Sequence, residues 1–169
     1  MATIDRLDVE LLTRMIANAR VGIAELAAGL GVSRTTVQQR LRRLEDERIL
    51  VGFQPIIDLS VIGLSVQALV SLEIDQRKMP TIIEGLRALP EVLEVRIQAG
   101  REDLLVHVAI ASLEELQRLT AAFVRLEGVR KTTSTFTVST PIPYRILPLL
   151  NELTKHAGWG RSTPAPQQD

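Results

Sequence analysis

The sequence predicts an α+β chain in two parts, an all-helical N-terminal domain and a C-terminal domain whose elements run βαββαβ. Three observations predict this fold class. Residues 1 to about 50 carry apolar side chains at helical spacing without convincing alternation. From Ser65 to about Thr140, stretches with strand-like alternation are interspersed with helix-like ones. Between the two parts, Gln54-Pro55 and Ile62-Gly63 supply the breakers expected of a linker.

The length and composition suit two small domains. The chain has 169 residues, of which 46% are hydrophobic, so each part can bury a core. We expect a first domain at residues 1–52, a linker strand or short helix at 53–64, a second domain at 65–141, a helical extension at 142–161, and a disordered tail rich in Pro and Gln at 162–169.

Three helices are predicted in the first domain. The first runs from about residue 4 to 17 with Thr3 as its N-cap, and the second from about residue 23 to 30, where Gly31 ends it. Ser33 caps a third helix that reaches about Arg48. A helix, a tight Gly-containing turn and a capped helix form a helix-turn-helix, here expected in a winged domain. The first helix is expected to bury Leu7, Leu11, Leu12, Met15 and Ile16, and the second Ile23, Leu26, Ala27 and Leu30.

The second domain is predicted to be ferredoxin-like. Strands are expected at 65–74, 92–99, 104–110 and about 129–139, and helices at about 79–89 and 113–126. In the second strand, we expect Leu93, Val95 and Ile97 to point inward. Both helices cover one sheet face, so the half-polar other face can meet solvent or a second copy of itself. That face carries Gln67, Ser71, Arg96, His107, Thr133 and Thr135.

The third helix of the first domain has two contrasting sides. Val37, Leu41 and Leu44 cluster on the side that must face the core. The opposite side suits the DNA major groove, because Gln reads adenine, Arg reads guanine and Thr contacts the thymine methyl group. We expect Thr35, Thr36, Gln38 and Gln39 to reach base edges, Arg42 and Arg43 to hold phosphates, and Ser33 and Arg34 to complete the interface.

Charge distribution supports DNA binding more than net charge does. The chain has 20 basic and 20 acidic residues, but residues 33–44 contain four arginines and no acid. Arg40, one of the four, flanks the apolar stripe and is instead a candidate for an ion pair within its own domain. The alternative interpretation is that this side of the helix is simply exposed to solvent. It is less favoured because the Gly-Val-Ser turn comes directly before the acid-free stretch with four arginines.

Composition argues against several other classes. The absence of Cys excludes disulfides, thiolate metal sites and Cys nucleophiles, and two His residues make an imidazole metal cluster improbable. We expect neither a metal nor a cofactor. For His107, an interface or core role is favoured over catalysis. The N-terminus lacks the features of a secretory signal and no apolar run has the length of a membrane span, so we expect a cytoplasmic protein.

The motifs resemble those of the leucine-responsive regulator/AsnC (Lrp/AsnC) family of transcription regulators. The resemblance covers residues 4 to 140. It is carried by IDRLDVELLTRMIANAR, by LAAGLGVSRTTVQQRLRRLEDERIL, by the linker VGFQPIIDLSVIGL, by QAGREDLLVHVAI and by LEGVRKTTSTFTV. This resemblance implies a two-domain subunit that binds double-stranded DNA and whose sheets pair face to face into dimers, which assemble into higher even-numbered oligomers.

The same resemblance implies an amino acid or related metabolite bound between dimers, near a Gly-x-x-Asp turn. Gly100 and Asp103 match that motif, and Thr132 and Ser134 match a Thr-x-Thr pattern in the last strand. Chemically, Glu102 or Asp103 suits an α-amino group and Arg101 a carboxylate. A plain β-turn with exposed charges remains the alternative, and Ala99 departs from the family by replacing a Thr.

Two other functions remain open at this point. Proteins similar to this family include sirohaem decarboxylases, which rely on His and Arg in the equivalent domain, but two His residues suit that chemistry poorly. The other alternative is an architectural protein that wraps DNA with little sequence preference. A sirohaem absorbance spectrum tests the first, and a comparison of specific with random duplexes tests the second.

Overall fold

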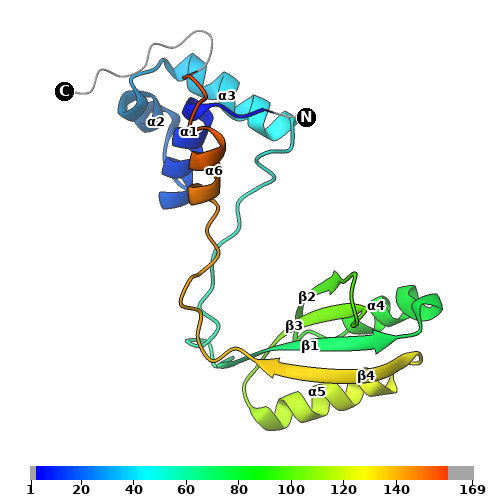
Figure 1. Cartoon of the computed structure of the whole chain (residues 1–169). Coiled ribbons are helices and arrows are strands. Elements are labelled where there is room, and N and C mark those ends of the chain that lie inside the picture. Colours follow the sequence, from blue (N-terminus) through cyan, green and yellow to red (C-terminus); the bar gives the residue numbers. More distant parts are fainter. Residues whose placement is uncertain (1–2, 160–169) are drawn as a thin grey trace. The chain divides into compact units, whose positions relative to one another are not determined.

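The computed structural model describes residues 3–159, so the predicted tail at 162–169 lies outside the described residues. The chain divides into two compact units. One contains the described parts of Met1–Pro55 and Ile142–Asp169, and the other is Ile56–Pro141. The described residues after 141, predicted as a helical extension, belong to the same unit as the N-terminal helices (Figure 1).

The first unit is entirely helical among the described residues. Its elements are α1 (Arg6–Ala17), α2 (Ile23–Leu30), α3 (Arg34–Asp46) and α6 (Leu147–Leu153). The prediction of Thr3 as the first N-cap was wrong, because Asp5 caps α1. The Asp5 carboxylate accepts from the Asp8 N–H at 3.1 Å, and the Asp8 carboxylate accepts from the Asp5 N–H at 3.0 Å, which forms a capping box.

The core of the first unit follows the predicted stripes with two exceptions. Ile16 and Ile23 were expected inside, but both are exposed. Each lies at an end of its helix, where no neighbouring element covers it. Trp159, from beyond α6, also packs against this core. The buried cluster consists of Leu7, Leu11, Leu26, Ala27, Leu30 and Val37.

The region between α3 and the second unit differs from the prediction. Helix α3 ends at Asp46 rather than Arg48, whose positive φ of 55° is incompatible with an α-helix. Residues 49–65 are all described and contain no strand or helix, so neither a wing nor the linker strand forms in the single chain. Several apolar side chains there are exposed: Val51, Phe53, Ile56, Ile57, Val61 and Ile62.

The second unit is a four-stranded antiparallel sheet with two α-helices on one face. The strands lie in the order β2-β3-β1-β4. Alternate strand residues such as Val70 and Val106 pack against Ile82 and Phe123 of the two helices. The elements are β1 (Val66–Ile74), the 3₁₀ helix η1 (Gln76–Lys78), α4 (Met79–Arg87), β2 (Val92–Ile97), β3 (Leu104–Ile110), α5 (Leu113–Arg125) and β4 (Val129–Phe136).

Of the three residues of β2 that were predicted to point inward, only Val95 packs against the core. Val92 and Val95 pack against the core, whereas Leu93 and Ile97 are exposed. A register shift between Val92 and Glu94 changes which side chains face the helices. Ile97 lies opposite Leu104, on the helix side, but at the end of an edge strand where the helices leave it uncovered.

The open sheet face agrees with the predicted polar set. His107 of β3 lies beside Gln67 of β1, with 3.2 Å between His107 Nε2 and Gln67 Oε1. These two residues help to line a shallow hollow of about 270 Å³, together with Leu69 and Leu105. None of the helices formed by the described residues is long and apolar enough to cross a membrane.

Candidate nucleic-acid interface and ligand site

Helix α3 is anchored from behind and capped at its start. Val37 and Leu44 are fully buried, which fixes the inner side of the helix. Ser33 is the N-cap, and its hydroxyl accepts from the Thr36 N–H at 3.0 Å. The hydroxyls of Ser33 and Thr36 are also 2.8 Å apart and hydrogen-bonded. Thr36, which was predicted to read bases, is therefore half-buried and engaged in the cap.

The outward side of α3 carries only polar side chains along its first nine residues. At about 100° per residue, the exposed positions cover an arc of roughly 140°. Their amide, hydroxyl and guanidinium groups match the donors and acceptors of base edges and phosphates. In the described chain these side chains face solvent, as a groove-reading surface requires. This outward set consists of Arg34, Thr35, Gln38, Gln39 and Arg42.

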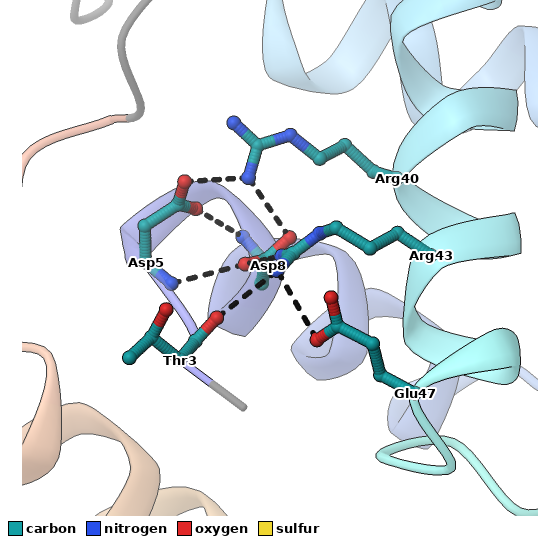
Figure 2. A network of polar contacts seen from close by, with 6 residues as sticks. All are labelled: Thr3, Asp5, Asp8, Arg40, Arg43 and Glu47. Atoms are coloured by element: carbon teal, nitrogen blue, oxygen red, sulfur yellow. Dashed lines mark hydrogen bonds and ion pairs between the residues drawn. The ribbon is translucent and has the colours of Figure 1, made fainter. Parts of the chain in front are cut away.

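The two remaining arginines of α3 turn inward to a pair of acids at the start of α1, the N-cap Asp5 and Asp8 (Figure 2). Arg40 Nη1 donates to Asp5 and, at 3.1 Å, to Asp8. Arg43 donates to the Asp8 carboxylate and, at 3.0 Å, to the Thr3 carbonyl oxygen. Asp8 is completely buried, so these two guanidinium groups balance a charge that water cannot reach.

This network confirms the interpretation of Arg40 and shows that Arg43 also has partners within its own unit. Arg40 forms the internal ion pair for which it was a candidate. Arg43 was predicted to hold DNA phosphates, but its guanidinium is occupied by Asp8, Thr3 and Glu47, the last at 3.5 Å. Arg43 lies at the border between the two sides of α3, where either orientation fits the helical spacing, so its contact with phosphates stays a prediction.

Electrostatics strengthens the same contact. Burial, the largest single influence, raises the pKa of Asp5. The hydrogen bonds from Arg40 and Asp8 and the charge of Arg40 together lower it by more than burial raises it, so the pKa of Asp5 lies below its usual range. The pKa of Arg40 is raised, because the bonds and charges of Asp5 and Asp8 outweigh its own desolvation. Sequence reasoning missed both acids, although their spacing of three residues before an apolar run is a capping-box signal.

In the second unit, the predicted ligand turn joins β2 to β3. Asp103 fixes it in place: its N–H donates to the Leu72 carbonyl oxygen at 2.9 Å, and its carboxylate accepts from the Ile74 N–H at 2.8 Å and from Gln76 Nε2 at 3.0 Å. These bonds lie at the register shift between Glu73 and Ile74. The bond from Ile74, then that from Gln76, lowers the pKa of Asp103. The Asp103 carboxylate therefore has a structural role in this turn, whether or not a ligand binds there.

The other predicted ligand residues surround this anchor unequally. Arg101 is exposed, with its Nε 4.0 Å from the Glu73 carboxylate, and Glu102 is half-buried. Position 100 does not require glycine for steric reasons, because a Cβ built there meets no atom within 4 Å. The turn therefore presents both signs of charge around accessible backbone.

The structure does not bring the two halves of the predicted ligand site together within one chain. Thr132 pairs with Leu72 and Ser134 with Val70, so β1 separates both from β3 and its turn. Both are half-buried on the helix side of β4. Among residues 3–159, no group of three or more metal-ligating side chains is placed to hold a metal ion.

Known proteins match both units. The model of the AsnC-type helix-turn-helix domain matches residues 4–45, and that of the Lrp/AsnC ligand binding domain matches residues 67–147. An HTH-type transcriptional regulator of Pyrococcus furiosus is 34% identical over 135 residues, which cover 78% of this chain and 90% of that protein. The chain belongs to the Lrp/AsnC family. AldR of Mycolicibacterium smegmatis, a transcriptional regulator, is 30% identical over 118 residues, 68% of this chain and 69% of its own.

Several solved structures share the fold of this chain. Escherichia coli AsnC is 26% identical with a TM-score of 0.79, covering 87% of this chain and 100% of its own. The leucine response regulatory protein LrpA of Mycobacterium tuberculosis is 29% identical with a TM-score of 0.67, covering 83% and 96%. A regulator from Neisseria meningitidis, in complex with L-methionine, is 21% identical with a TM-score of 0.78, covering 87% and 99%.

Membership of the Lrp/AsnC family defines the general function of this chain. It is a DNA-binding transcription regulator with a helix-turn-helix in its first unit and a ligand-binding domain in its second. The family consists of regulators and not enzymes, which removes the decarboxylase alternative.

Proposed function

We propose that this Lrp/AsnC regulator reads a near-palindromic DNA site as a dimer, by inserting the outward side of α3 into the major groove. The carrying observation is the contrast between the buried side of α3 and its solvent-facing polar side. Gln38, Gln39 and Thr35 reach base edges, and Arg34 and Arg42 hold phosphates. Two copies present their helices roughly 34–36 Å apart, one turn of DNA.

Gln39 provides the sharpest test of base reading. Gln39→Ala should flatten the sequence preference measured on a library of randomised duplexes, while affinity for arbitrary duplexes changes little. Gln54→Ala, an exposed position beyond the end of α3, is the matched control and should keep the preference. Equal affinity of the wild-type chain for all duplexes would instead indicate an architectural protein without sequence preference.

We also propose that the turn at Gly100–Asp103 binds a small metabolite of the amino acid class. Support comes from the ligand-binding domain match, from the mixed charges of Arg101 and Glu102, and from the L-methionine complex of a protein with the same fold. The site is completed at the contact between dimers, with Thr132 and Ser134 supplied from a neighbouring copy. Ligand binding shifts the assembly, with a coupling free energy of about 1–3 kcal/mol.

A thermal-shift screen of the twenty amino acids tests the ligand proposal. For any amino acid that raises the melting temperature, Gly100→Val should abolish the increase without lowering the basal melting temperature, because its side chain has free space in the single chain. Gly22→Val, also in open space but in the other unit, is the control. A ligand that stabilises Gly100→Val as strongly as the wild type binds elsewhere.

A further inference from the structure

Helix α1 buries two of its faces, and the helix-turn-helix covers only one of them. Leu7 and Leu11 belong to the core shared with α2 and α3. Val9 lies about 200° around the helix from Leu7, yet only 2% of its surface is exposed. The element beside it is α6, since Val9 lines a groove with Asn151 and Thr154. The second face of α1 is therefore covered from the far end of the chain.

The contacts continue past α6. The Gly158 carbonyl oxygen accepts from the Arg6 N–H at 3.3 Å, and Trp159 packs against the core of the unit. Thr154 is buried at the end of α6, whereas Leu149 and Leu153 on its outer side are 56% and 67% exposed. The docking is thus one-sided, with inward and outward positions on the same helix.

Both chain connections between the units start from one end of the sheet. The segment before β1 leads from the helix-turn-helix, and residues 137–146 after β4 lead back to α6. Strands β1 and β4 are neighbours, with Ala68 opposite Phe136 and the Thr137 N–H donating to the Gln67 carbonyl oxygen at 3.2 Å. Two covalent arms therefore leave side by side.

We propose that residues 137–159, here called the return segment, are a positioning element for DNA binding. By docking on α1, the return segment gives the first unit a second connection to the sheet, in addition to the segment before β1. This second connection restricts how far the two recognition helices of a dimer can move apart. The restraint reaches α3 because α1 also carries Asp5 and Asp8, which hold Arg40 and Arg43. This inference rests on the proposed dimeric reading of DNA. A second arm of fixed length raises the effective concentration of the second helix at its half-site.

An insertion that lengthens the arm without touching its contacts is the decisive variant. Six Gly and Ser residues placed between Thr140 and Pro141 add a flexible reach of about 13 Å. The probes are duplexes selected by the wild-type chain from a random library, rebuilt with one half-site or with two half-sites at varied spacing. Thr140→Ser with Pro141→Gly changes composition without adding length and serves as the control.

The lengthened chain should keep wild-type affinity for one half-site and the same Trp159 fluorescence. Its affinity for two half-sites at the preferred spacing should fall about tenfold, and its dependence on spacing should flatten. Trp159→Ala should produce the same flattening, while Leu149→Ala and Leu153→Ala should not. A spacing profile unchanged by the insertion overturns the role of the return segment even if the chain is a dimer. A monomer in light scattering overturns both this inference and the proposed dimeric reading.

Discussion

At the scale of single residues, neighbouring arginines of α3 have different surroundings and therefore different expected effects. Arg42 is exposed on the outward side of the helix, whereas Arg43 donates to the buried carboxylate of Asp8. A guanidinium free in solvent is available to a phosphate, but one that neutralises a buried carboxylate contributes to folding. Replacing each in turn separates these roles.

We predict that Arg42→Ala lowers affinity for every duplex and reduces the slope of log affinity against log salt by about 0.9, the value for one lost phosphate contact. Arg43→Ala should leave that slope unchanged. It should instead lower the free energy of unfolding of the first unit by about 1–3 kcal/mol, a value reduced from that of a fully buried pair because Arg43 is partly exposed. Salt-titrated binding and urea unfolding measure the two quantities. A reduced salt slope in Arg43→Ala would instead show that Arg43 contacts a phosphate.

The lowered pKa of Asp5 predicts a loss of stability in acid. Because its pKa is lower in the folded than in the unfolded chain, the contribution of Asp5 is complete above the unfolded value, about 3.9, and disappears as the pH falls through the folded value. Trp159, the single Trp of the chain, reports unfolding of this unit. Asp5→Asn should show a shallower loss of stability between about pH 5 and pH 2 than the wild type. Parallel curves for the two proteins would contradict this assignment.

At the scale of elements, Asp103 holds the β2–β3 turn against β1. Its carboxylate supplies the acceptor for the Ile74 N–H, at a point where the register between β1 and β4 shifts. A buried N–H that loses its acceptor costs more than the same group in solvent. The turn, the register shift and the start of η1, through Gln76, therefore depend on one side chain.

Asp103→Ala should lower the free energy of unfolding of the second unit by an amount on the order of 1 kcal/mol, because the Ile74 N–H is left unpaired. Asp103→Asn keeps a carbonyl acceptor and should lose less. Glu102→Ala, the neighbouring position in the same turn, is the control. Urea unfolding followed by circular dichroism measures the change. Equal losses in the Ala variants of Asp103 and Glu102 would mean that the bond to Ile74 contributes nothing.

The sequence predicted the elements well where the local pattern determines them. The helix-turn-helix, the βαββαβ order and the burial of alternate residues in β1 follow from apolar spacing and capping residues. Helical spacing also placed Gln39 and Arg42 on the solvent side of α3. Within β2, however, the register shift between Val92 and Glu94 places Val92 against the core and leaves Leu93 exposed, and nothing in the local alternation marks that shift.

The features that the sequence did not predict depend on contacts between distant segments. The partner of Arg43 lies 35 residues earlier in the chain, and either Asp8 or a phosphate satisfies a guanidinium. The burial of Val9 depends on α6, which lies more than 130 residues later in the chain. Periodicity within one helix shows that a face is apolar, but not which segment covers it.

At the scale of the whole molecule, apolar side chains are half-buried on the open sheet face and exposed in residues 49–65. Leu69 and Leu105 lie among polar residues on the open face, and Phe53 and Ile56 are exposed beyond α3. Exposed apolar surface of this extent is typical of chains that associate. We propose that the open sheet face is the contact between the two copies of the dimer.

Leu69→Lys should therefore dissociate the assembly toward the 18.7 kDa single chain, because it would place a charge within the contact between sheets. Val124→Lys, on the exposed side of α5, is the matched control and should leave the assembly intact. Light scattering after size exclusion measures the mass. A Leu69→Lys chain with the same mass as the wild type would show that the open face is not the contact.

The covering of α1 by residues near the C-terminal end has a consequence for synthesis on the ribosome. The helix-turn-helix is translated first, but the Val9 face of α1 stays bare until α6 and Trp159 have emerged. A polypeptide that ends after β4 would contain all four strands of the sheet but would lack the part of the first unit that covers α1. If such fragments pair with full-length copies, they yield mixed assemblies with one impaired half. Premature stops late in the gene should then be dominant rather than recessive.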